Sequence, residues 1–401
     1  MAKKSSQRPA LLAGATERFV DLVVAFRNST LRNFVPKRLK AVGYHLVPRQ
    51  MMEHKMRLAD YQRFTADVEP RPVCTSVTIG IIKDYMYKYG RFEAACAEMG
   101  IPYKLIDITV DGWIQEVRAS GCHAFVVWPA YIDSRAKKLY DERLRLLVED
   151  LGQLLFPSYK ALWLYESKHR IRDWLEVHDV PHPRTWVFTG RSEAEEFVAN
   201  ASYPLVFKTD VGSSAFGVRL LRSRRQAIKV VRACFGKGFL PRRHDRRDRA
   251  WGTALFQEYV PDVDEWRVIR LADSYFGYQK LKEGQFHSGS HLCGWYTPPV
   301  GLLELCRRVT EIGPFYSMSL DVFETPGGEF LVNELHPVFG PEEPSEMYVD
   351  GVPGRYLYDE PARSWRFEEG CFNRRGSCPL RLAKVLQMLG VPLPECVKGW
   401  V

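Results

Sequence analysis

The segment DVFETPGGEFLVNELHP, residues 321–337, contains a turn that two short apolar runs flank. The runs cover residues 320–323 and 329–332, and Pro326-Gly327-Gly328 between them is typical of a β-hairpin turn. Asp321 lies near the start of the first strand and Glu334 at the end of the second, so both carboxylates can reach one spot. Hard oxygen ligands of this kind suit Mg²⁺, which completes its octahedron with water and phosphate oxygens. Acidic residues at hairpin ends are also commonly solvated, so segments upstream decide the matter.

Residues 203–221, YPLVFKTDVGSSAFGVRLL, place a lysine at the end of an apolar strand. Small residues follow Lys208, and they let backbone N–H groups approach phosphate oxygens while the lysine supplies a positive charge. Gly212 and Gly217 have the spacing of a P-loop, but Val218 stands where that motif needs its lysine, and a strand follows instead of a helix. A P-loop is therefore excluded. An ordinary hairpin with one exposed lysine is the alternative.

Residues 255–270 carry two glutamates at a junction between strands. Glu258 ends the strand in LFQEYV (255–260), and Glu265 begins the next one in DEWRVIR (264–270). At such a junction, backbone groups and one carboxylate could bind an adenine edge, and the second carboxylate could bind ribose hydroxyls. Surface charge alternating along two strands is the competing interpretation.

Taken in this order, the three segments resemble the ATP-grasp superfamily of carboxylate–amine and carboxylate–thiol ligases. The resemblance covers residues 156–340 and includes YESK (165–168) and DVPHPRT (179–185). These two are similar to the family's opening helix with its phosphate-side lysine and to the entry of its next strand. The pattern is nearest to ribosomal-protein-glutamate-ligase-like and D-alanine–D-alanine-ligase-like members. It implies α+β lobes that bind ATP and Mg²⁺.

The resemblance also implies roles for individual residues. ATP phosphates would contact Lys168, Lys208 and the loop that contains Gly212, Ser213, Ser214 and Gly217. Adenine would meet Glu258 and its neighbours Gln257, Tyr259 and Val260, and the ribose would meet Glu265. Mg²⁺ would be bound by Asp321 and Glu334.

Two positions depart from the family pattern. The second metal position commonly reads Glu-x-Asn, whereas here it reads Glu334-Leu-His336, and imidazole suits softer metals than Mg²⁺. His336 therefore binds Mn²⁺, contacts phosphate or only packs. Some relatives place an arginine where this chain has Ser319, so charge must be neutralised elsewhere. The candidates are Arg267, Lys280 and Lys282, and each of them could equally be a solvated cation. His287 follows them in a loop that faces phosphate and substrate in relatives.

Composition agrees with a cytoplasmic enzyme. A chain of 401 residues with 46% hydrophobic content predicts roughly two to four domains with real cores. No apolar run reaches the roughly 18 to 20 residues of a membrane span, and no cleavable signal is recognised. The cysteines lack a CxxC pair, which predicts reduced thiols with neither disulfides nor structural zinc. A net charge of +9 suits an anionic substrate, but no basic stripe interleaved with aromatics indicates nucleic acid.

The chain divides into four predicted regions and an α/β fold class. Residues 1–72 form a basic helical extension that packs on the body or, less favoured, rests on an anionic membrane. Residues 73–157 alternate strand and helix as a half-Rossmann-like parallel domain without a dinucleotide motif. Residues 158–345 form the ATP-grasp domain, with a mobile lobe at about 186–262 whose polar segment 242–249 is either a flap or a solvated loop. Residues 346–401 form a tail with a helix over 380–389.

The implied reaction activates a carboxylate. Transfer of the ATP γ-phosphoryl group gives an acyl phosphate, which an amine attacks with release of phosphate, so the protein needs positioned cations and metal rather than a nucleophile. Such a ligase would take small-molecule carboxylates and amines, and a homo-oligomer is possible. A phosphotransferase on the same fold and an ATP-binding scaffold are the two alternatives.

Overall fold

The computed structural model describes residues 49–131, 133–211, 217–240, 248–282, 292–339 and 345–398. Most of the predicted basic N-terminal extension therefore lies outside the described residues. Its described part is helix α3 (Arg49–Thr65), which packs against α4 (Gly90–Met99). Arg375 of the C-terminal region donates hydrogen bonds to the carbonyl oxygens of Phe64 and Asp67 next to it, so the end of α3 is tied to the body.

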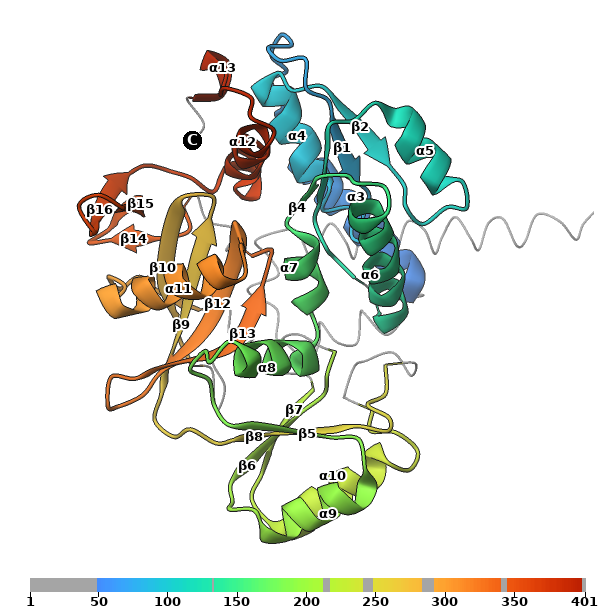
Figure 1. The fold of residues 1–401 in the computed structure, drawn as a ribbon, viewed down its shortest axis with the longest axis vertical. Coiled ribbons are helices and arrows are strands. Elements are labelled where there is room, and N and C mark those ends of the chain that lie inside the picture. Colours follow the sequence, from blue (N-terminus) through green and yellow to red (C-terminus); the bar gives the residue numbers. More distant parts are fainter. Residues whose placement is uncertain are drawn as a thin grey trace, which may run out of the picture.

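A parallel four-stranded sheet in the order β2-β1-β3-β4 forms the first layered unit (Figure 1). Its strands are β1 (Ile79–Ile82), β2 (Tyr103–Ile106), β3 (Ala124–Val127) and β4 (Leu155–Phe156). Parallel strands must be covered on both faces. Helix α4 and the C-terminal α12 (Cys378–Met388) share a core with one face, and α5 (Trp113–Ser120) and α6 (Ser134–Glu149) share a core with the other.

A small antiparallel lobe holds the segment that contains Lys208. The strands β5 (Thr185–Phe188), β6 (Leu205–Lys208), β7 (Val218–Leu221) and β8 (Ala254–Glu258) lie in the order β5-β8-β6-β7. Helices α9 (Arg191–Asn200) and α10 (Arg224–Cys234) contribute apolar residues to the core on one face of this sheet. In Figure 1 this lobe is the lower end of the molecule, with α9 and α10 outermost.

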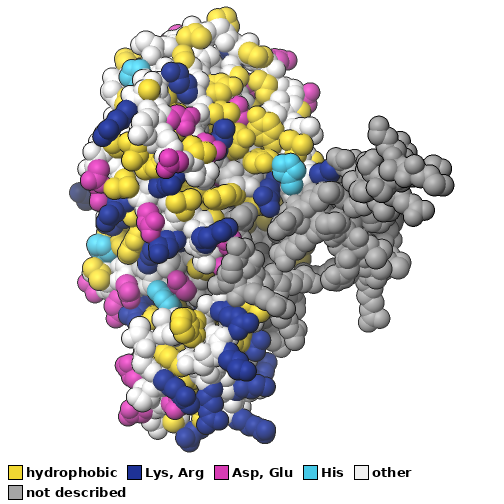
Figure 2. All heavy atoms as spheres, turned by 90° about the vertical axis from the view of Figure 1, so that its right-hand side faces the viewer, with side chains coloured by type: hydrophobic (Ala, Val, Ile, Leu, Met, Phe, Trp, Pro, Cys, Tyr) yellow, Lys and Arg dark blue, Asp and Glu magenta, His cyan; other side chains and the backbone are white. Residues whose placement is uncertain are grey.

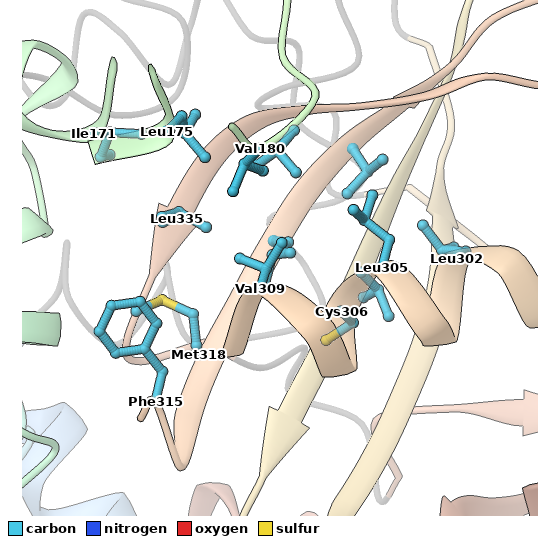
Figure 3. Close-up of a cluster of buried hydrophobic side chains, with 14 of the residues drawn as sticks. Ile171, Leu175, Val180, Leu302, Leu305, Cys306, Val309, Phe315, Met318 and Leu335 are labelled. Carbon is cyan, nitrogen blue, oxygen red and sulfur yellow. The ribbon is translucent and has the colours of Figure 1, made fainter. Parts of the chain in front are cut away.

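The large sheet has the main order β13-β12-β9-β10-β15-β14, with β11 and β16 paired at its side. Its strands are β9 (Asp264–Leu271), β10 (Ser274–Lys280), β11 (Cys293–Gly294), β12 (Ser317–Glu324), β13 (Phe330–His336), β14 (Tyr348–Val349), β15 (Val352–Asp359) and β16 (Ser364–Glu369). Helices α8 (Lys168–Val177) and α11 (Val300–Ile312) pack their apolar residues against Met318 and Leu335 of this sheet (Figure 3). Alternation along β12 therefore leaves Ser317, Ser319 and Asp321 on the opposite face.

The predicted hairpin around Gly327 is longer than its apolar runs suggested. The paired strands extend to Ser317 and His336, because buried side chains continue the alternation on both sides. The region after residue 345 is also richer than a tail with one helix. It supplies three strands, and β15 pairs with β10 inside the large sheet. Short helices α7 (Tyr159–Leu164) and α13 (Glu395–Lys398) and the 3₁₀ turn Arg374–Gly376 complete the described elements.

The prediction that the chain has no disulfide is wrong. Cys74 is disulfide-bonded in the structure. Spacing alone could not reveal this, because a disulfide needs two thiols brought together in space. None of the described helices is both long and apolar enough to cross a bilayer.

Candidate active site

Asp321 and Glu334 face each other across the β12–β13 hairpin. They are register partners, and the pairing shifts by one residue directly after them, so Asn333 is the extra residue of a β-bulge. On the other side of β12, Asp321 lies opposite Arg267 of β9. The hairpin therefore brings two carboxylates together beside a strand that carries a cation.

The Asp321 carboxylate is buried and held by two cations. Arg267 donates from Nε to Oδ1 at 2.8 Å and from Nη2 to Oδ2 at 3.0 Å, and Lys280 Nζ donates to Oδ2 at 3.0 Å. Burial alone raises the pKa of Asp321, but the charges of Arg267 and Lys280 outweigh it and hold that pKa well below its usual value. Asp321 is thus an anion whose neighbours are already arranged around negative charge.

His336 lies between the two carboxylates. Its Nε2 is 3.2 Å from Glu334 Oε2 and 3.6 Å from Asp321 Oδ2. Burial lowers the pKa of His336, but its bonds to the two carboxylates prevail and raise that pKa to about 9. Burial likewise raises the pKa of Glu334, and the nearby Lys168 and His336 charges reverse this and lower it. Without an ion, a protonated imidazole therefore bridges the carboxylates.

The three side chains fit a divalent cation by type and by spacing. Asp321, Glu334 and His336 each offer one ligand atom, and these atoms lie within 4.8 Å of one another. A carboxylate offers about four lone-pair sites, so Asp321 can bind an ion in addition to Arg267 and Lys280. A metal would replace the imidazole proton as the positive charge between the carboxylates, and His336 would have to lose that proton to become a ligand.

Two lysines approach the same carboxylates from different elements. Lys168 begins α8, and its Nζ is 3.7 Å from Glu334 Oε1. Lys208 ends β6, and its Nζ donates to Asn333 Oδ1 at 2.7 Å. Burial lowers the pKa of Lys208 to about 8. The bulge therefore places Asn333 against Lys208, while Glu334 lies beside Lys168. No signal in the sequence indicated this role of Asn333.

Asp210 ties the start of α8 to the end of β6. Ser167 Oγ donates to Asp210 Oδ1 at 3.0 Å, and the backbone N–H of His169 donates to the same oxygen at 2.9 Å. Ser167 is itself the N-cap of α8. This link fixes the two lysines relative to each other, and it also was not predicted, since Asp210 reads as an ordinary loop residue.

A pocket lies between the small lobe and the large sheet. It holds about 310 Å³ of space free of atoms, part of it open to solvent. Its walls come from α8, β5, β6, β8 and β13 and include Lys168, His182, Thr185, Lys208, Gln257 and Asn333. The pocket therefore reaches both lysines and the strand that carries Glu334.

The predicted adenine segment lies at the exit of β8. Glu258 Oε1 accepts from the backbone N–H of Arg184 at 2.7 Å, and Gln257 Nε2 donates to Thr185 Oγ1 at 3.1 Å. Both bonds join β8 to the entry of β5. Tyr259 is exposed and Val260 half-buried, while Glu265 is buried and bonded to Lys280. Gln257 lines the pocket, and Glu258 follows it at the junction.

The remaining predicted residues divide into three groups. Lys282 is exposed beyond the end of β10, and none of the bonds described above involves it. Gly217 is buried, and a Cβ there would lie 1.9 Å from Thr209 Oγ1, so the chain needs glycine at this close approach. Gly212, Ser213, Ser214 and His287 lie outside the described residues.

The sequence of this chain is similar to that of a ligase. It is 23% identical to the alpha-aminoadipate–LysW ligase LysX of Saccharolobus solfataricus over 225 residues, 55% of this chain and 78% of that protein. The structure adds two lobes, Lys168 at the start of α8, Lys208 at the end of β6 and a pair of carboxylates. This similarity to a ligase agrees with the ATP-grasp resemblance of the sequence motifs.

Other comparisons cover less of the chain or share less identity. This chain is 23% identical to the bifunctional purine biosynthetic protein PUR2,5 of Pichia angusta over 163 residues, 38% of this chain but only 20% of that protein. The RimK domain ATP-grasp protein of Sphaerobacter thermophilus shares 17% identity over 65% of this chain and 90% of its own, with a TM-score of 0.46. The ADP complex of PurK shares 16% identity over 67% and 71%, with a TM-score of 0.47. No family model matches the chain.

Replacing His336 by asparagine tests whether this side chain binds metal. Asparagine supplies a hard amide oxygen in place of a nitrogen, so we expect the ratio of activities with Mn²⁺ and Mg²⁺ to shift toward Mg²⁺. Metal titrations of turnover for both proteins measure that ratio. An unchanged ratio would assign His336 to packing between the carboxylates.

Proposed function

We propose that this ATP-grasp protein is an ATP-dependent ligase that activates a carboxylate as an acyl phosphate and couples it to an amine, releasing ADP and phosphate. The observation that carries the proposal is the pair of the buried Asp321 and the half-buried Glu334. Lys168, Lys208, Arg267 and Lys280 lie around this pair at the edge of a pocket between two lobes. Phosphoryl transfer depends on positioning and on neutralising spread negative charge, and this arrangement supplies both.

The proposed roles follow from these contacts. Lys168 and Lys208 bind phosphate oxygens, and Asp321 and Glu334 bind Mg²⁺, with Mn²⁺ as an alternative through His336. The ion, when bound, neutralises charge on the phosphates. Arg267 and Lys280 point at Asp321 and lie where negative charge grows as the phosphoryl group moves to the acceptor, so they stabilise that charge.

Adenosine binding extends from the same pocket. Residues 257–260, which include Glu258, offer polar groups to the adenine edge at the end of β8. Glu265 offers its carboxylate to the ribose. Glu265 is bonded to Lys280 in the ion-free site, so ribose binding would compete with Lys280 for that carboxylate. The loop 212–217 closes over the phosphates and His287 contacts substrate, both as predictions from the resemblance.

The substrates are a small carboxylic acid and an amine, in peptide, natural-product or surface-glycan tailoring. LysX, to which the chain is similar, is a ligase by name, which supports a ligase reaction. A cytoplasmic location and a homo-oligomer complete the proposal.

The products distinguish the ligase from its alternatives. With an acid and an amine found by screening for ADP release, we expect ADP and inorganic phosphate rather than AMP and pyrophosphate. Hydroxylamine should replace the amine and trap a hydroxamate, and ¹⁸O from the labelled carboxylate should appear in the released phosphate, because one carboxylate oxygen leaves with phosphorus. Mass spectrometry of both products measures this.

Two other outcomes would contradict the ligase. ADP formed together with a stable phosphorylated substrate, and no free phosphate, would establish a phosphotransferase. ATP bound tightly by the wild-type protein, but turned over with no acid and amine of a broad panel, would favour a scaffold.

A further inference from the structure

Exposed cations cover the β7–α10 side of the small lobe. Figure 2 shows Lys and Arg side chains gathered over the lower lobe, where acidic side chains are few on the same side. Their sources are the end of β7, helix α10 and the segment that returns to β8. The exposed members, which we call the lobe patch, are Arg219, Arg222, Arg224, Arg225, Lys229, Arg232, Lys237 and Arg249.

Helix α10 has no acidic residue to balance its cations. Its sequence, RRQAIKVVRAC, contains four basic residues and neither Asp nor Glu. Within the described parts of the chain, the only ion pair of α10 joins Arg232 Nε to Glu195 Oε1 at 3.9 Å, and it involves none of the other three cations of the helix. Helix α6 is the contrast, because Lys138 and Arg145 each pair with a glutamate four residues on.

The arrangement of charges in α10 opposes helix stability. Arg224 and Arg225 occupy its first turn, where the helix dipole is positive and acidic residues are favoured. Arg225 and Lys229 are four residues apart, where like charges repel. The apolar face of α10 packs through Ala227, Val230, Val231 and Cys234, so folding needs none of these cations. An anionic ligand outside the protein accounts for charges that the fold itself does not use.

An exposed aromatic ring adjoins the patch. Trp251 is 73% exposed, although its Nε1 donates to Gly236 O at 3.1 Å. The N–H of Gly252 donates to the carbonyl oxygen of Cys234, the last residue of α10, at 3.0 Å, which places Trp251 beside the end of that helix. Indole rings are favoured at membrane interfaces, where the ring contacts acyl chains and the N–H stays among polar groups.

The patch residues of α10 lie in the outer helix layer of the lobe, next to α9, which carries Glu193, Glu195 and Glu196. Helices α9 and α10 form the lower end of the molecule in Figure 1, on the far side of the small sheet from the body. A flat array of phosphates can meet such a layer without any groove. A nucleic-acid strand, in contrast, is usually held in a positively charged groove with stacked bases.

We propose that the lobe patch binds the surface of an anionic phospholipid membrane, with Trp251 at the headgroup level. Each Lys or Arg near such a surface contributes about 1 kcal/mol, so a patch of this size supports reversible binding that salt weakens. Binding here leaves the pocket between the lobes accessible, because the patch and the pocket share no residue. The protein would thus act on its substrates at a membrane surface.

Sedimentation of the full-length protein with vesicles tests the proposal. One vesicle is phosphatidylcholine alone, and the other is an equal mixture of phosphatidylcholine and phosphatidylglycerol. We expect binding to the mixed vesicles only, with loss at high salt. The variant carrying Arg224→Gln, Arg225→Gln and Lys229→Gln should bind roughly a hundred-fold more weakly, since three cations are removed and Gln keeps a good helix propensity.

A matched triple variant on α6 serves as the control. Arg135→Gln, Lys138→Gln and Arg145→Gln also remove three exposed charges, and they should leave vesicle binding within about twofold of wild type, because none of them lies in the patch. Trp251→Ala should weaken binding without changing its dependence on salt. Circular dichroism and thermal unfolding confirm that each variant is folded.

Three results would overturn the proposal. Equal binding to both vesicles would show that negative charge is not recognised. Equal loss in the α6 and α10 variants would assign the effect to net charge, and full binding by the α10 variant would assign it to another basic segment, such as residues 1–48. Binding to a DNA duplex or to polyglutamate, without binding to the mixed vesicles, would replace the membrane by that partner.

Discussion

Asp321→Asn and Glu334→Gln should each abolish metal-dependent ATP turnover, with a loss on the order of a thousand-fold or more. Each change keeps the shape of the side chain but removes one hard anionic ligand from the cluster that fits a cation. Steady-state ADP release at several Mg²⁺ concentrations measures the effect. Higher Mg²⁺ should restore part of the activity of Glu334→Gln, because a weakened site can be filled by mass action.

The two variants are expected to differ in stability. Asp321 balances Arg267 and Lys280 in the interior, and removing one partner of a buried ion cluster costs about 3–5 kcal/mol. Asp321→Asn should therefore also unfold at lower denaturant concentration, whereas Glu334→Gln should unfold close to wild type. Glu329→Gln, an exposed residue of the same hairpin, is the control and should change neither property. Wild-type turnover in both site variants at low Mg²⁺ would make the hairpin structural.

Lys208→Ala should weaken ATP binding or the chemical step by about 2–4 kcal/mol, the range for a charged contact in a closed site. The Lys208 ammonium is nearly buried, and its pKa is lowered to about 8 because burial disfavours the charged form. A bound phosphate would add negative charge beside the ammonium group and favour its charged form. Calorimetric titration with a non-hydrolysable ATP analogue, together with turnover, separates a loss of affinity from a loss of rate.

Lys229→Ala provides the matched control for Lys208→Ala. It removes the same type of side chain from the same lobe, but from an exposed position on α10. Its affinity for the analogue should equal that of wild type. If Lys208→Ala also kept wild-type affinity and rate, the lysine at the end of β6 would not be a phosphate ligand.

Short-range signals in the sequence predicted the elements that carry the site. Apolar runs around a Pro-Gly-Gly turn indicated the β12–β13 hairpin, and the apolar run that ends at Lys208 indicated β6 and its last residue. Apolar runs also predicted strands at residues 77–82, 103–108 and 123–128, and the structure has strands at 79–82, 103–106 and 124–127. Such patterns are visible because burial acts on each element separately and leaves a periodic trace.

The partners of these residues depended on distances that no local pattern encodes. Arg267 and Lys280 were equally plausible as solvated cations, and only the pairing of β12 with β9 and of β9 with β10 brings both to Asp321. Asn333 reaches Lys208 because a bulge inserts it between paired residues. The disulfide at Cys74 and the strands contributed by residues 348–369 are long-range features of the same kind.

The sequence by itself therefore determined which residue types stand at the ends and centres of strands, and with them the ATP-grasp pattern. Tertiary structure alone decided which charges neutralise one another, since a cation and a carboxylate separated by 54 positions interact only when the sheet register joins them. Among the described residues it also left Arg224, Arg225 and Lys229 of α10 without an ion pair, whereas Lys138 and Arg145 of α6 each lie 3.8 Å from a glutamate. The physical reason is that hydrophobic periodicity is a property of neighbouring residues, whereas electrostatic pairing acts over a few ångströms in space, whatever the distance along the chain.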